Sequence, residues 1–143
     1  ERFGSAEHLP KQPASGEELL ALSMRMIEFT VYDERIILTR KLLLTEQFHD
    51  ERVCSLATKY FLYGTQNIFA TIFQEMMEDG LMKKDDAKML AFMFTAPISS
   101  LIQLCTREPD KQEEVMQRAE AFVKYFITNH VKNKYTLGGS YEL

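Results

Sequence analysis

Few residues in this chain of 143 have the types and the spacing that chemistry requires. Glu46 and His49 show the Glu-x-x-His spacing of di-iron helical bundles, but such sites need two copies of the motif and two further inward-pointing glutamates. Only one copy is present, so we expect no metal site. His8 and His130 stand near the two ends of the chain and are expected at the surface.

Three acidic pairs lie at or near predicted helix starts, where carboxylates stabilise free backbone N–H groups and complement the helix dipole. These pairs are Glu17-Glu18, Asp85-Asp86 and Glu113-Glu114. The sequence contains no glycine-rich phosphate loop, no Gly-x-Ser-x-Gly motif and no His-Glu-x-x-His motif. We therefore predict that the chain is not an enzyme and holds no cofactor.

Composition and charge narrow the class of protein. Cys54 and Cys105 are far apart in apolar helical surroundings, so we expect two buried small hydrophobic residues in a reduced, cytoplasmic protein. A formal charge of -4 and a pI near 5.4, without a Lys/Arg stripe, argue against direct nucleic-acid binding. The longest apolar run, residues 89–94, is far shorter than the roughly 20 residues of a membrane-spanning helix, so no membrane contact is expected.

The elements that must position these residues are helices, because apolar residues recur with a helical period and no strand alternation is convincing. We predict an all-α helical bundle of about five helices, spanning about 16–32, 34–47, 50–79 and 86–104, with a last helix beginning at Asp110. Ser15 and Glu18 have the spacing of a capping box, and Gly80 suits the left-handed position after a helix end. Pro97 predicts a bend near Met93. A flexible lead-in over 1–15, a domain over 16–132 and a frayed tail over 133–143 complete this organisation.

The second predicted helix has a leucine-rich side that we expect to be buried. The buried set is Ile36, Ile37, Leu38, Leu42, Leu43 and Leu44, and the residues expected to face water are Arg35, Arg40 and Lys41. The chain is also rich in Phe (10), Tyr (6) and Met (8). Such residues suit an adaptable apolar pocket, but they fill solid cores as well, and the sequence does not separate the two.

The order of elements across residues 17–131 resembles the ligand-binding and dimerisation domain of TetR/AcrR-type transcriptional regulators. The residues that carry the resemblance are Leu22–Phe29, the segment 40–48, Glu78-Asp-Gly-Leu81, Phe94-Thr-Ala-Pro-Ile98 and the Arg107-Glu-Pro-Asp110 break before a final amphipathic helix. That family carries an N-terminal three-helix DNA-binding part, which has no counterpart in this sequence. We expect that it was cut away, so that DNA would be contacted only through the missing part.

The resemblance implies a binding site and an interface. A small apolar or amphipathic effector would lie among the helices matching 17–32, 50–79 and 86–104, and its implied contacts are Met26, Phe29, Phe61, Phe69, Phe73 and Phe92. The last two helices would pair with their copies in a homodimer through Leu90, Phe94, Ile98, Leu101, Ala119, Phe122 and Phe126. Glu28 weakly admits a cationic ligand, but a glutamate that faces solvent is the safer interpretation. The alternative is a ligand-free helical homodimerisation or scaffold module with a solid interior.

Overall fold

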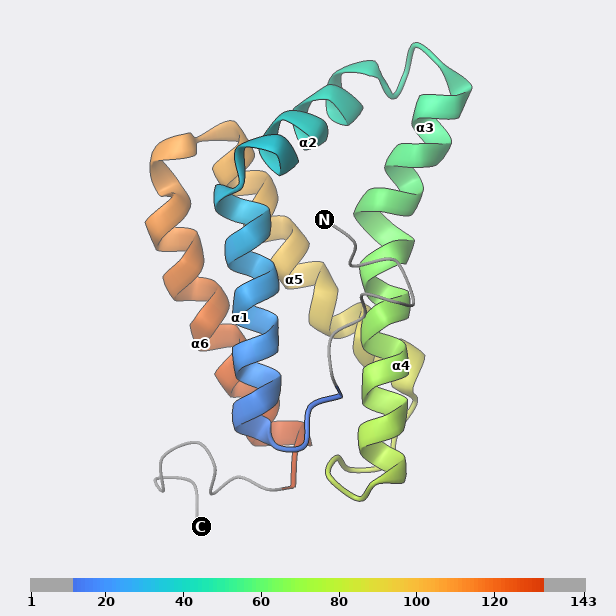
Figure 1. The fold of residues 1–143 in the computed structure, drawn as a ribbon, viewed down its shortest axis with the longest axis vertical. Helices are drawn as coiled ribbons and strands as arrows, with labels where there is room; N and C mark the ends of the chain where they lie inside the picture. The colour runs from blue at the N-terminus through green and yellow to red at the C-terminus, as the bar shows by residue number, and fades with distance from the viewer. Residues whose placement is uncertain (1–11, 133–143) are drawn as a thin grey trace.

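The computed structural model describes residues 12–132, which form an all-α bundle, as predicted (Figure 1). Its elements are α1 (Gly16–Tyr32), α2 (Glu34–Glu46), α3 (Glu51–Thr58), the π-helical turn η2 (Lys59–Tyr63), α4 (Gly64–Glu78), α5 (Ala87–Arg107), the 3-10 turn η3 (Pro109–Lys111) and α6 (Gln112–His130). Because α3, η2 and α4 follow one another without a break, they form the single long helix that the sequence predicts. Residues 1–11 of the predicted lead-in and the predicted tail over 133–143 lie outside the described residues.

Local signals in the sequence fix the helix ends. The Oγ atom of Ser15 accepts a hydrogen bond of 3.1 Å from the backbone N–H of Glu18, and the carboxylate of Glu18 accepts one of 2.8 Å from the N–H of Ala14. Gly80 has a φ of 78°, in the left-handed region that glycine adopts without a steric penalty. Both predicted helix boundaries are therefore confirmed.

Phenylalanine side chains form the centre of the core. Phe94 on α5 lies with its ring centroid 4.7 Å from that of Phe126 on α6 and 4.9 Å from that of Phe69 on α4. The rings of Phe73 and Phe122 lie 5.4 Å and 5.8 Å from it. These five residues, which we call the aromatic cluster, join α4, α5 and α6, while α1 packs beside α6 (Figure 1).

Helix α2 crosses one end of the bundle, above the ends of α1 and α5 (Figure 1), and packs mainly against α1 and α3. Its predicted register is only partly right. Leu43 is buried and Arg35 and Lys41 face water as predicted, but Leu44 is exposed. Leu38 and Leu42 are 66% and 62% exposed, whereas Arg40, which was expected to face water, is only 4% exposed. The physical reason is that a helix lying across the end of a bundle buries one narrow face. Leu43 and Arg40 occupy that face here.

Helix α5 continues across Pro97. Pro97 and Met93 are both exposed, so water can reach the Met93 carbonyl that lacks an N–H partner. By length and composition alone this helix could cross a membrane. The sequence prediction considered only its uninterrupted apolar run, residues 89–94, which is too short to do so. Its inner face belongs to the core of the bundle, because Phe94 is completely buried and Leu90 is only 3% exposed.

Candidate ligand-binding site

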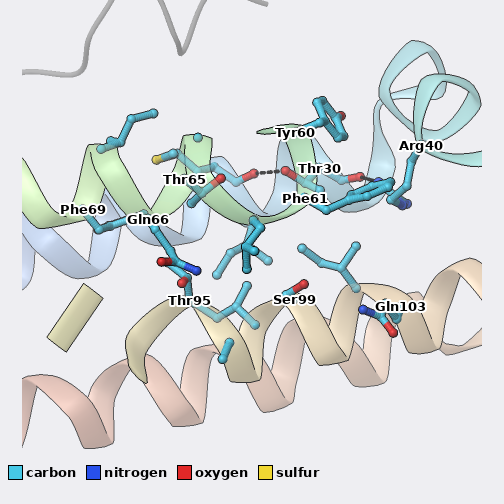
Figure 2. Close-up of a pocket in the computed structure, with 18 of the residues that line it drawn as sticks. Thr30, Arg40, Tyr60, Phe61, Thr65, Gln66, Phe69, Thr95, Ser99 and Gln103 are labelled. Carbon is cyan, nitrogen blue, oxygen red and sulfur yellow. Dashed lines mark hydrogen bonds between the residues drawn. The ribbon is translucent and has the colours of Figure 1, made fainter. Parts of the chain in front are cut away.

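A cavity of about 810 Å³ lies between α1, α2, the η2–α4 segment and α5 (Figure 2). Binding sites for small molecules typically have volumes of about 300–1,000 Å³ and mostly apolar walls. The inner wall on α1 includes Met26, Ile27 and Phe29, and α5 supplies Phe92 and Ile98 opposite. The cavity therefore has the size and the lining of a site for a small apolar or amphipathic molecule.

Five of the six residues predicted to contact a ligand line this cavity: Met26, Phe29, Phe61, Phe69 and Phe92. Phe73 does not, and its assignment is corrected here. It lies one helical turn after Phe69 on α4, where its ring stacks on that of Phe126 at 5.4 Å and is completely buried. Direct packing of α4 against the core leaves no space beside Phe73.

Arg40 is the functional candidate that the sequence analysis missed. Its Nε atom donates a hydrogen bond of 2.8 Å to the hydroxyl of Thr106, and its Nη1 atom donates one of 2.9 Å to the carbonyl of Thr30. Thr30 and Thr106 lie near the carboxyl ends of α1 and α5, where helix dipoles favour a cation. The guanidinium thus connects two helix ends at the wall of the cavity (Figure 2). No clear signal in the sequence marked it, because Arg40 is one of two arginines in a leucine-rich helix.

Burial shifts the pKa values of Arg40 and of its ionisable neighbours in the direction of their neutral forms. Burial lowers the pKa of Arg40, and its two neighbours Cys105 and Tyr60 oppose that shift. Burial also raises the pKa of the Cys105 thiol and of the Tyr60 phenol, and in both cases the charge of Arg40 acts in the opposite direction. A thiol with a raised pKa is a poor nucleophile. The arrangement is suited to binding a ligand by hydrogen bonds and apolar contact.

A second polar region lies farther along the cavity, on α1, α4 and α5. Ser23 is completely buried and lines the cavity, yet its hydroxyl has no hydrogen-bond partner among residues 12–132. The Thr95 hydroxyl donates to the carbonyl of Ala91 at 2.9 Å. Gln66 reaches toward the same space from α4 (Figure 2). Because a buried hydroxyl without a partner is costly, Ser23 marks a position that a polar group of a ligand would satisfy.

The other described residues that could bind a metal or take part in catalysis do not lie together in one site. His49 is exposed, and its Nδ1 atom lies 3.7 Å from a carboxylate oxygen of Glu46. No group of three or more metal-ligating side chains occurs within residues 12–132. Cys105 is buried as predicted, but the prediction for Cys54 is wrong, because that residue lies on the exposed side of α3.

The predicted interface residues also need correction. Five of the seven are buried inside the chain itself, where they cannot offer surface to a second copy: Leu90, Phe94, Ile98, Ala119 and Phe126. The other two, Leu101 and Phe122, are half-buried. Helix α5 carries apolar residues on its outer side as well. Met89 and Met93, which are 53% and 52% exposed, lie on the outer side.

Comparison of the chain with known protein families, with characterised proteins and with solved structures yields no match.

Proposed function

We propose that residues 16–132 form the effector-binding and dimerisation domain of a TetR-type transcriptional regulator. The observation that supports this function most directly is the cavity of about 810 Å³ among α1, α2, α4 and α5. It lies between the helices where the resemblance implies an effector. The alternative, a ligand-free scaffold, requires a solid interior, so the cavity argues against it.

The outer side of α5 is the surface that we assign to dimerisation. Met89, Met93 and Pro97 are exposed and follow one another at four-residue spacing, so they form one stripe along the helix. Between Lys88 and Arg107 this helix carries no charged residue. Contiguous exposed apolar surface of this kind is typical of interfaces. A second copy packed on this stripe would also reach the half-buried Leu101 and Phe122.

In the proposed mechanism the effector acts through α5. This helix lines the cavity with one side and carries the exposed stripe on another, so a ligand that favours one position of α5 also favours one dimer arrangement. A coupling free energy of about 1–3 kcal/mol is enough for such a switch. DNA-reading units attached to the two subunits would then change their spacing.

The test is binding of a neutral apolar dye, Nile red, to the cavity. Ser99 is half-buried and lines the cavity on α5, so Ser99→Trp places a large ring there. Gln117→Trp on the exposed side of α6 is the matched control. We expect the first variant to weaken dye binding by about 10-fold or more, the order of what one filled apolar subsite contributes, and the control to leave it unchanged.

The introduced tryptophan also reports its own surroundings, because the chain has no other tryptophan. Emission from Ser99→Trp should be blue-shifted relative to Gln117→Trp if the ring fills an apolar cavity. Failure of the unmodified protein to bind any apolar probe would contradict the proposed function.

A further inference from the structure

The charges around the cavity differ in sign from the charge of the whole chain. The chain carries a formal charge of -4, yet the charged residues that line the cavity are Arg40 and Lys59, and no aspartate or glutamate lines it within residues 12–132. Arg40 is enclosed at the wall, whereas Lys59 lies exposed on η2. The cavity is therefore an apolar space with a net positive lining.

Arg40 retains donors that have no acceptor among residues 12–132. A guanidinium carries five N–H groups in a planar fork. Within residues 12–132, only those on Nε and Nη1 have acceptors, Thr106 and Thr30, and both acceptors are neutral. No described carboxylate forms an ion pair with Arg40. The Nη2 atom is left without an acceptor on a residue that lines the cavity.

A purely structural role for Arg40 explains part of this arrangement. The carboxyl ends of α1 and α5 carry partial negative charge and stabilise a cation between them. Two hydrogen bonds to neutral acceptors do not by themselves require a charged group, and burying a charge without an ion pair is costly. The structural role therefore accounts for the two hydrogen bonds, and among residues 12–132 it leaves the Nη2 donors of Arg40 available to a ligand.

We propose that the effector is a monoanionic amphiphile whose carboxylate pairs with Arg40 and whose apolar body lies along Phe61, Ile68 and Phe69. This assignment rests on the proposed function and specifies its ligand class. A carboxylate matches the planar guanidinium fork and neutralises its single charge. A phosphate dianion would leave a net negative charge enclosed among apolar side chains, because Lys59 is exposed rather than enclosed with Arg40.

The distance between the two polar regions adds a feature of the ligand. Arg40 is bonded to the Thr30 carbonyl, and Ser23 lies seven residues earlier on the same helix. At a rise of about 1.5 Å per residue the two positions are about 10 Å apart along α1. A hydroxyl or keto group at that distance from the carboxylate would satisfy the buried hydroxyl of Ser23.

The experiment compares three probes with one alkyl chain and different head groups. Dodecanoate, dodecan-1-ol and dodecyltrimethylammonium are each titrated, below the concentration at which they aggregate, against protein loaded with Nile red. We expect dodecanoate to displace the dye at a concentration about 10- to 100-fold lower than dodecan-1-ol, as charge-assisted hydrogen bonds predict. The ammonium probe should bind more weakly than the alcohol.

Substitution of Arg40 tests whether this residue recognises the head group of the probe. Arg40→Gln should abolish the preference for dodecanoate while leaving displacement by dodecan-1-ol within about 3-fold of the original, because the apolar contacts remain. Arg35→Gln, on the same helix with an exposed side chain, is the matched control and should retain the preference. If Arg40→Gln does not fold, Arg40→Lys is used in its place because it retains the charge. The comparison of probes on the unmodified protein still decides whether the cavity prefers an anionic head group.

The outcomes separate this inference from the proposed function. Equal displacement by dodecanoate and dodecan-1-ol, or strongest displacement by the ammonium probe, overturns the assignment of an anionic effector and leaves the apolar binding site in place. A preference for dodecanoate that survives in Arg40→Gln overturns the role of Arg40. Absence of binding by Nile red and by all three probes contradicts the proposed function itself.

Discussion

Truncation of Phe94 to alanine tests whether this residue belongs to the core of one chain or to an interface between two. Phe94 is completely buried and its ring lies between 4.7 and 5.8 Å from four other rings. Removal of a buried phenylalanine ring typically costs about 3–5 kcal/mol of unfolding free energy. Contacts with four rings place Phe94 in the upper half of that range, at about 4 kcal/mol. That is a large part of the roughly 5–15 kcal/mol that stabilises a domain.

The matched control is Tyr125→Ala, an aromatic residue on α6 that is 70% exposed and lies outside the proposed interface. A surface substitution of this kind changes the unfolding free energy by about 0.5 kcal/mol or less. Urea unfolding followed by far-ultraviolet circular dichroism measures both variants. With a slope of about 2 kcal/mol per molar urea, Phe94→Ala should lower the midpoint by about 2 M.

Protein concentration separates folding from association in this experiment. A core residue lowers the midpoint by the same amount at every protein concentration, whereas loss of an interface residue gives an effect that depends on concentration. The reasoning is refuted if Phe94→Ala unfolds within about 1 kcal/mol of the unmodified protein, because a completely enclosed ring cannot be removed at so small a cost.

Two further predictions concern pH and association. Burial lowers the pKa of His130, with Lys83 acting in the same direction and Asp85 opposing, so protonation favours the unfolded chain. The contribution of this group to stability is therefore complete above the ordinary histidine pKa of about 6.5 and is lost as the pH falls from that value through the lowered pKa of the folded state. The drop in urea midpoint between pH 7.5 and pH 5 should be smaller in His130→Gln, and an equal drop contradicts this role. Met93→Glu should yield monomers by light scattering after size exclusion. It should lower the unfolding free energy of the isolated chain by no more than about 0.5 kcal/mol, because the carboxylate stays in water. An unchanged dimer would remove the outer stripe of α5 from the proposed interface.

The sequence predicts the helices of this protein well because their ends are local features. Ser15, Gly80 and Asp86 determine helix ends through hydrogen bonds or a backbone angle within a few residues. The π-helical turn η2 was not predicted, since it inserts one residue into a helix without a distinctive local sequence. Its residues Tyr60 and Phe61 nonetheless line the cavity, so the turn contributes to the candidate site.

Which side of α2 is buried depends on how many helices surround it. The local sequence does not carry that information. A leucine-rich helix in the centre of a bundle buries its leucines. In this protein α2 lies across the end of the bundle (Figure 1), so Leu38 and Leu42 remain exposed while Arg40 reaches the two helix ends below. Charge alone suggested that Arg40 faces water, and only the arrangement of α1 and α5 shows its acceptors.

The same limit applies to the candidate site, as Phe69 and Phe73 show. They are identical in chemistry and lie one turn apart on the same face of α4, so any rule based on residue type and helical spacing assigns them the same role. Phe69 lines the cavity, and Phe73 packs in the aromatic cluster. What distinguishes them is how closely the neighbouring helices approach each turn of α4. Phe126 covers Phe73, whereas the space beside Phe69 opens toward Ser23 and Thr95. The boundary between core and cavity thus falls within one helical face, and a ligand that occupied the cavity would rest directly on the aromatic cluster through Phe69.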